Sequence, residues 1–231
     1  MVKWTSFLIV LLVAGLAVTT AAGTNSPAEF TFNDQHQLGM RIGVWANQGG
    51  TVPEWLSSST LTMETKINDA SFYFEGYFGY RWWSQAVIEF SMGMVNRGTV
   101  TMSDATGTDV GNLMVYPLLI HMKWYPLAPL NRKFQPYVAV GGGLYYGRRS
   151  VQLTTSSYYL YGYSLNEASE TDFNYSLSAG IDWPFSHSIG LEMNVRYSPI
   201  YFSNSLLTVR DYDAVMVTVG VKYLRAVKSQ K

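Results

Sequence analysis

Between about residue 36 and residue 225, apolar and polar residues alternate along the chain in eight separate segments. A period of two indicates β-strands, because successive side chains of a strand point to opposite faces of a sheet. The predicted strands are about 36–46, 69–82, 86–95, 112–125, 135–148, 171–183, 188–201 and 213–225. Each offers roughly the 9–11 residues with which a tilted strand crosses a bilayer. We therefore expect an all-β protein.

The connections between these segments alternate in length, beginning and ending with a long one. Long loops on one rim and tight turns on the other are typical of an up-and-down barrel. An even number of strands lets the first and last pair, so that no strand edge leaves backbone groups unpaired in hydrocarbon. The expected fold is a closed antiparallel up-and-down transmembrane β-barrel of about eight strands.

Composition narrows the function classes. Charged residues make up 14% of the chain, against about 25% in soluble domains. Lys and Arg together number 16, as do Asp and Glu, so no net charge attracts nucleic acid. The chain has no cysteine, which excludes disulfide frameworks, thiolate metal sites and cysteine nucleophiles.

The first residues have the pattern of an export signal. Lys3 precedes an apolar run from Phe7 to Val18, and Ala21 and Ala22 follow as small residues at a cleavage site. A membrane anchor is the alternative, but a spanning helix needs roughly 20 residues. We expect a signal peptide at 1–22, a short periplasmic segment at 23–35, the transmembrane barrel at 36–225 and a periplasmic tail at 226–231.

The two faces of the predicted strands differ in chemistry. A soluble barrel or sandwich would show the same alternation, so the positions of the aromatic residues decide between the two. If the tight turns lie in the periplasm, five aromatic residues of the apolar face form a periplasmic aromatic belt: Tyr80, Trp82, Trp124, Trp183 and Tyr223. A second belt is expected at the opposite end: Phe72, Phe74, Tyr116, Tyr146, Phe173 and Tyr197. The apolar face is therefore expected to contact lipid.

The polar face carries four acids and four bases, which we expect to form a lumen charge network: Arg41, Glu75, Glu89, Lys123, Asp182, Glu192, Arg196 and Lys222. The interior of an eight-stranded barrel is just wide enough for side chains to fill. Buried charges must therefore pair or become neutral. The balanced signs favour a paired, plugged lumen, and a gated or narrow polar pathway is the alternative.

Three segments carry a resemblance to a known family: PYVAVGGGLYYG (136–147), SLSAGIDWPFSHSIGLEMNVRY (176–197) and VTVGVKY (217–223). Over about residues 28–225 the chain resembles the OmpA-like small outer-membrane β-barrel domains. The resemblance implies an outer membrane of a Gram-negative-type bacterium, and insertion by the barrel-assembly machinery with periplasmic chaperones. Such chains commonly stop at the last aromatic residue, whereas Tyr223 is followed here by a basic tail with Arg225, Lys228 and Lys231.

Sites for chemistry are sparse. His36, His121 and His187 have no metal-site or triad spacing, and His121 is interpreted as a satisfied lumen residue. The run His187-Ser188 with Glu192 nearby suggests a lipid-modifying hydrolase, but adjacent strand residues point to opposite faces. Four loop carboxylates lack a calcium-loop spacing and are candidates only for contact with divalent cations or lipopolysaccharide: Asp104, Asp109, Asp211 and Asp213.

The most unusual loop spans about 149–170. Four of its tyrosines form a candidate contact surface, or simply stack on strands that run past the bilayer: Tyr158, Tyr159, Tyr161 and Tyr163. We expect a structural, non-enzymatic, monomeric barrel without a cofactor. Its expected partners are outer-membrane lipid, lipopolysaccharide and the assembly factors, and not nucleic acid. The alternatives are a small channel for ions or hydrophobic solutes and, more distantly, a lipid-modifying enzyme.

Overall fold

The structure is a computed structural model, and it describes residues 35–48, 56–57, 61–104, 107–130, 134–151, 167–186, 188–206 and 209–226. The expected signal peptide, the four loop tyrosines and His187 lie outside the described residues. The first barrel strand begins at Gln35 and the last ends at Ala226, one residue beyond each expected barrel boundary.

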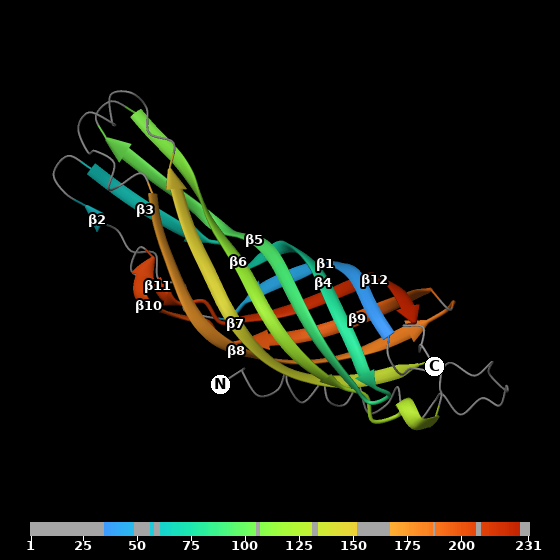
Figure 1. The fold of residues 1–231 in the computed structure, drawn as a ribbon. Coiled ribbons are helices and arrows are strands. Elements are labelled where there is room, and N and C mark those ends of the chain that lie inside the picture. The colour runs from blue at the N-terminus through green and yellow to red at the C-terminus, as the bar shows by residue number, and fades with distance from the viewer. Residues whose placement is uncertain are drawn as a thin grey trace.

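Eight long antiparallel strands form a closed barrel (Figure 1). They are β1 (Gln35–Asn47), β4 (Ala70–Trp83), β5 (Ala86–Asp104), β6 (Gly107–Trp124), β7 (Gln135–Val151), β8 (Glu167–Pro184), β9 (Ile189–Ser198) and β12 (Ala214–Ala226). Each pairs with the next, and β12 pairs with β1, where Met40 lies opposite Val221. The predicted fold class is confirmed. Among the described residues, no helix is long and apolar enough to span a membrane.

The strands at one end run further than the sequence predicted. The expected loop after β1 contains β2 (Leu56–Ser57) and β3 (Leu61–Ile67), and the expected loop between β5 and β6 is almost entirely strand. Residues 98–104 of β5 pair with β3 on one side and with β6 on the other. The β-branched run Thr99 to Thr101 favours this extended structure, although its polar composition suggested a loop. The extended strands project well beyond β1, β9 and β12 (Figure 1).

The predicted seventh strand is too long at its end. β9 stops at Ser198, because Pro199 has no N–H to donate to a neighbouring strand. The chain then forms a separate two-stranded sheet from β10 (Tyr201–Leu206) and β11 (Val209–Asp211). Three residues between β6 and β7 form the short 3-10 helix η1 (Ala128–Leu130). We call the end of the barrel with η1 the turn end, and the end with β10 and β11 the loop end.

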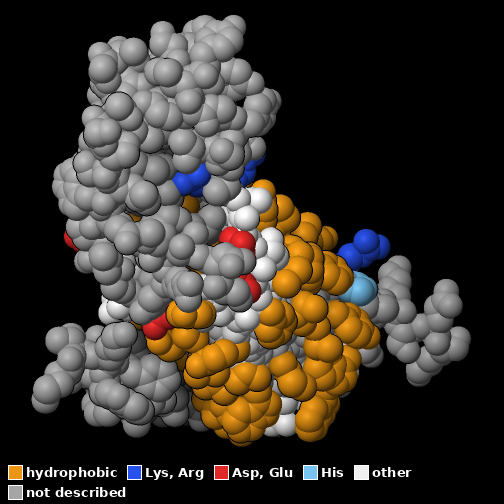
Figure 2. Space-filling view, turned by 90° about the vertical axis from the view of Figure 1, so that its left-hand side faces the viewer, with side chains coloured by type: hydrophobic (Ala, Val, Ile, Leu, Met, Phe, Trp, Pro, Cys, Tyr) orange, Lys and Arg blue, Asp and Glu red, His pale blue; other side chains and the backbone are white. Residues whose placement is uncertain are grey.

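The outer face of the barrel is apolar. Met40 is 61% exposed and Val140 is 58% exposed, and Figure 2 shows hydrophobic side chains gathered over one continuous area of the wall. An exposed apolar surface of this extent marks contact with a membrane or another apolar partner. Towards the loop end the apolar area gives way to the exposed polar side chains of Asn96 in β5, Asn112 in β6 and Arg148 in β7.

Two glycines of neighbouring strands show how closely the inner face is packed. A Cβ added at Gly39 of β1 would lie 2.5 Å from the hydroxyl oxygen of Tyr77 and 2.7 Å from its Cε1. Tyr77 is 3% exposed, so its ring has little room to move. A Cβ added at Gly76 of β4, on the outer face, would meet nothing within 4 Å.

We therefore expect Gly39→Ala to lower the free energy of unfolding by roughly 1–3 kcal/mol, through displacement of Tyr77. The matched control Gly76→Ala should change it by less than about 0.5 kcal/mol. Urea unfolding of the refolded protein in detergent micelles measures both. Equal effects of the two substitutions would contradict the inward packing of Gly39.

Candidate functional site

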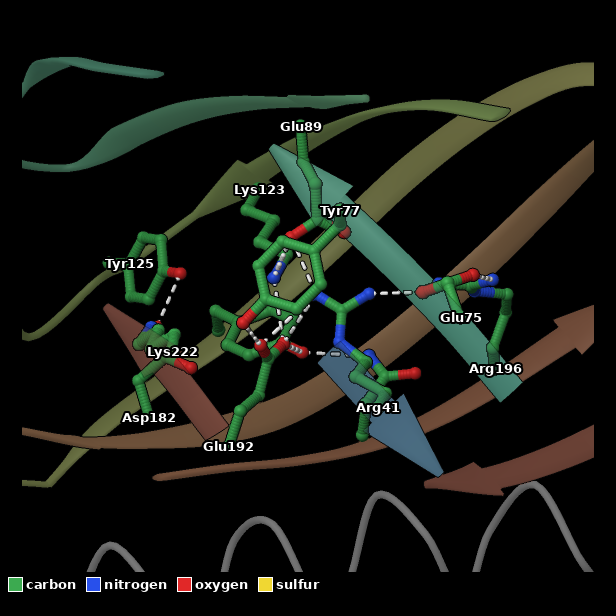
Figure 3. Close-up of polar contacts among 12 residues, drawn as sticks. Arg41, Glu75, Tyr77, Glu89, Lys123, Tyr125, Asp182, Glu192, Arg196 and Lys222 are labelled. Atoms are coloured by element: carbon green, nitrogen blue, oxygen red, sulfur yellow. Dashed lines mark hydrogen bonds and ion pairs between the residues drawn. The ribbon is translucent and has the colours of Figure 1, made fainter. Parts of the chain in front are cut away.

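The candidate site is the polar interior of the barrel. Alternation along the strands turns all eight residues of the lumen charge network inward, and none is more than 3% exposed. They come from seven strands: Arg41 in β1, Glu75 in β4, Glu89 in β5, Lys123 in β6, Asp182 in β8, Glu192 and Arg196 in β9, and Lys222 in β12. Contacts join six of them into one group, and Asp182 and Lys222 form a separate pair (Figure 3).

Glu192 is the centre of the larger group. Its carboxylate accepts hydrogen bonds from Arg41 NH2 at 3.0 Å and from Lys123 Nζ at 2.7 Å. The hydroxyl of Tyr77 donates to it at 2.7 Å, and the hydroxyl of Tyr137 donates from β7. Tyr137 adds the eighth strand to the network. One carboxylate thus links four strands besides its own across the lumen.

Glu75 forms a second branch of the group. The two terminal nitrogens of Arg196 donate to its two oxygens at 2.6 Å and 3.0 Å, which is the bidentate geometry of a strong arginine–carboxylate pair. Arg41 NH1 donates to the same carboxylate, and the hydroxyl of Tyr73 donates at 2.6 Å. Because both carboxylate oxygens are hydrogen-bonded, the charge of Glu75 is well compensated inside the protein.

The remaining two acids are also paired. Glu89 accepts from Lys123 Nζ at 2.5 Å and from NH2 of Arg41, the arginine whose NH1 donates to Glu75. Asp182 pairs with Lys222 and accepts from the hydroxyl of Tyr125 at 2.7 Å. Each of the four acids thus contacts at least one of the four bases, as buried charges require.

The sequence did not reveal the hydroxyl donors, and the predicted charge network leaves out three further buried arginines: Arg81, Arg97 and Arg149. Periodicity predicts which face a tyrosine occupies, but it does not reveal which carboxylate its hydroxyl reaches. Arg81 is buried on the inner face of β4, and its Cζ lies 4.2 Å from the ring centroid of Tyr125. Arg97 and Arg149 are buried as well, but they lay in segments expected to be loops.

The charge network lies between two apolar clusters. The loop-end cluster consists of Trp45, Tyr73, Val95, Leu113, Val115, Leu119, Tyr145, Ile200, Phe202, Tyr212, Ala214 and Met216. The turn-end cluster consists of Val87, Tyr125, Ala128, Tyr137 and Ala139. Ile200, Phe202 and Tyr212 of the first cluster come from the connection between β9 and β12, and each has no exposed surface. The interior is therefore packed with side chains at both ends of the network.

The predicted periplasmic aromatic belt lies on the outer face at the turn end. Its five residues are each 36–52% exposed: Tyr80, Trp82, Trp124, Trp183 and Tyr223. Phe134 stacks on Trp183 with ring centroids 5.3 Å apart, and the rings of His36 and Tyr80 lie tilted to each other with centroids 5.2 Å apart. The residues of the second expected belt also lie on the outer face, partly or largely exposed.

The other candidate residues do not form a catalytic arrangement in the described part of the chain. His121 Nε2 lies 2.7 Å from Ser176 Oγ, and both residues are buried. Ser188 is exposed in a turn, whereas Glu192 is held in the charge network. The described residues hold no group of three His, Asp or Glu that could bind a metal.

Of the four loop carboxylates, Asp213 alone has a described side chain. Its Oδ2 accepts from the hydroxyl of Tyr197 at 3.0 Å, and its Oδ1 accepts from the backbone N–H of Ile200 at 3.1 Å. It therefore fixes the start of the connection between β9 and β12. The side chains of Asp104, Asp109 and Asp211 lie outside the described part of the structure.

Comparison with known proteins supports the fold. No family model and no curated protein matches the chain. The chain is similar in structure to the outer membrane protein OprG from Pseudomonas aeruginosa, with 15% identity, 84% of this chain and 97% of that chain covered, and a TM-score of 0.54. Neisserial surface protein A is 14% identical, the match covers 82% of this chain and 96% of that chain, and the TM-score is 0.51.

A third similar structure is Ail, the attachment invasion locus protein of Yersinia pestis, in complex with the heparin analogue sucrose octasulfate. It is 11% identical, the match covers 84% of this chain and 99% of that chain, and the TM-score is 0.51. Identities this low show the fold alone. The resemblance to small outer-membrane barrels is confirmed at that level, and membership of the OmpA-like family in particular is not.

We expect Glu192→Gln to lower the free energy of unfolding by roughly 3–5 kcal/mol, because it leaves buried positive charge without its partner. The double variant Glu192→Gln, Lys123→Met removes the surplus charge, and it should recover part of that loss. A double-mutant cycle by urea unfolding in micelles measures the coupling. Strict additivity of the two substitutions would show that the two charges do not interact.

Proposed function

We propose that this chain is a structural, non-enzymatic protein of the outer membrane of a Gram-negative-type bacterium. It anchors in the membrane through a plugged barrel and presents a β-sheet on the cell surface. The apolar outer face supports the membrane location, because a monomer in water rarely exposes a surface of that kind. Two of the solved neighbours support it as well, since one is described as an outer membrane protein and the other as a surface protein.

The filled lumen is the observation that carries the structural role. Charged side chains of the network are paired across the barrel, and apolar clusters pack above and below them. Ion passage would require breaking contacts between buried charges, which costs several kcal/mol for each charge left unpaired. The side chains that would line a pathway instead tie the strands to one another.

The orientation follows from the connections. In barrels of this type the tight turns face the periplasm and the long connections face outwards. The loop end is therefore extracellular in this proposal. There β5 continues from Asn96 to Asp104, and β7 continues from Arg148 to Val151, beyond the end of the apolar outer face. In the sequence, the four tyrosines at 158–163 lie between β7 and β8.

The proposed partners follow from the surfaces. The outer face contacts acyl chains, and the extracellular extension contacts lipopolysaccharide or ligands at the cell surface. The barrel-assembly machinery and periplasmic chaperones would insert the chain. The closed ring leaves no free barrel edge for a second copy, which supports a monomer.

Single-channel recording in planar bilayers tests the plugged barrel. We expect no steady openings from the refolded protein, because the network and both apolar clusters fill the lumen. Steady openings whose ion selectivity changes in Lys123→Met would instead support the channel alternative. Heat-modifiable migration on gels confirms beforehand that both proteins are folded.

A further inference from the structure

Arg97 is a buried cation outside the charge network. It lies in β5 at the point where the register against β6 shifts between Asn96 and Gly98. The exposed neighbour Asn96 marks the end of the apolar outer face on this strand. Arg97 itself points inward at the loop end and has no exposed surface. It therefore carries a positive charge into the mouth of the barrel.

The contacts of Arg97 leave most of its donors unused. Its NH2 donates to Asn47 Oδ1 at 2.7 Å, and its Cζ lies 5.2 Å from the ring centroid of Trp45. Among the described residues, its Nε and NH1 have no hydrogen-bond partner. The indole Nε1 of Trp45 is likewise buried with no partner in that part of the chain. Two neighbouring side chains thus hold N–H donors that lack an acceptor.

No carboxylate compensates the charge of Arg97 within the described residues. Asp213, on the segment that leads into β12, directs its carboxylate to Tyr197 and to the backbone of Ile200. An uncompensated buried cation is costly, so a counter-charge would stabilise this part of the fold.

The chemistry of the donors selects the ligand. A water molecule would bring two hydrogens of its own, whereas the free groups here are the N–H donors of Arg97 and Trp45. An anion accepts hydrogen bonds without donating any, and it supplies the missing negative charge. Both side chains are fully buried, so the ligand must be small.

We propose that Arg97 and Trp45 hold one small monovalent anion, of the size of chloride, at the loop end of the barrel. The anion would join β5 to β1, beside the loop-end cluster that includes Tyr212. The site is separate from the charge network, where each acid already has a basic partner.

Urea unfolding of the refolded protein in micelles tests the proposal, with chloride exchanged for gluconate at constant ionic strength. Gluconate is too large for a fully buried site. Binding to the folded state alone lowers the unfolding equilibrium constant tenfold for each tenfold rise in chloride above the dissociation constant. An unfolding midpoint that does not depend on the choice of anion would overturn the proposal.

Two pairs of variants locate the effect. Arg97→Met should abolish the chloride dependence, whereas Arg148→Met, which removes an exposed charge of the same end, should keep it. Trp45→Phe removes only the indole N–H donor and should weaken the dependence. Trp124→Phe on the outer face is its control. If Arg97→Met does not refold, Trp45→Phe is compared with Trp124→Phe instead. Equal dependence of the unfolding midpoint on chloride in these two variants would contradict the site.

Crystals grown in bromide provide a test that needs no variant. We expect an anomalous peak within hydrogen-bond distance of Arg97 and Trp45 Nε1. A water molecule at that position, with no anomalous signal, would show that the donors are hydrated and would overturn the proposal.

Discussion

Closing eight strands into a narrow ring imposes one condition on every inward side chain: its partners must lie inside the ring. Polar groups there have little access to bulk water, and an unpaired charge is costly. The carboxylate of Glu192 meets this condition by binding Arg41, Lys123 and two tyrosine hydroxyls from four other strands. The outward side chains must instead be apolar, because they contact hydrocarbon. These two requirements together produce the alternation from which the whole fold follows.

The sequence was sufficient to predict features that depend on this alternation. The eight strands and the inward position of all eight network charges follow from the period of two. Partner choice does not, because the contact of Arg196 with Glu75 depends on the barrel's register and diameter. The polar run near Thr99 suggested a loop, yet pairing with β3 and β6 makes it strand. Arg97 was missed for the same reason.

The interior and the surface extension have complementary roles. The network and the two apolar clusters fix the barrel as a rigid base, so that four of its neighbouring strands, β5 to β8, can continue outwards beyond it. The β9 to β12 connection ends the barrel on the other side, where Ile200 and Phe202 turn inward and cover the loop end. The buried cation Arg97 lies at the junction of these two regions. This arrangement favours an anchor with an outer contact surface over an open conduit.

The proposed membrane location depends on contact between the apolar face and lipid. Because the chain has no native cysteine, spin labels placed at Met92→Cys, Val140→Cys and Asn96→Cys in lipid vesicles test that assignment directly. We expect the first two labels to collide more often with oxygen dissolved in the bilayer than with a water-soluble nickel complex, and the third label to show the reverse. Ready access of the nickel complex to the labels at 92 and 140 would contradict it.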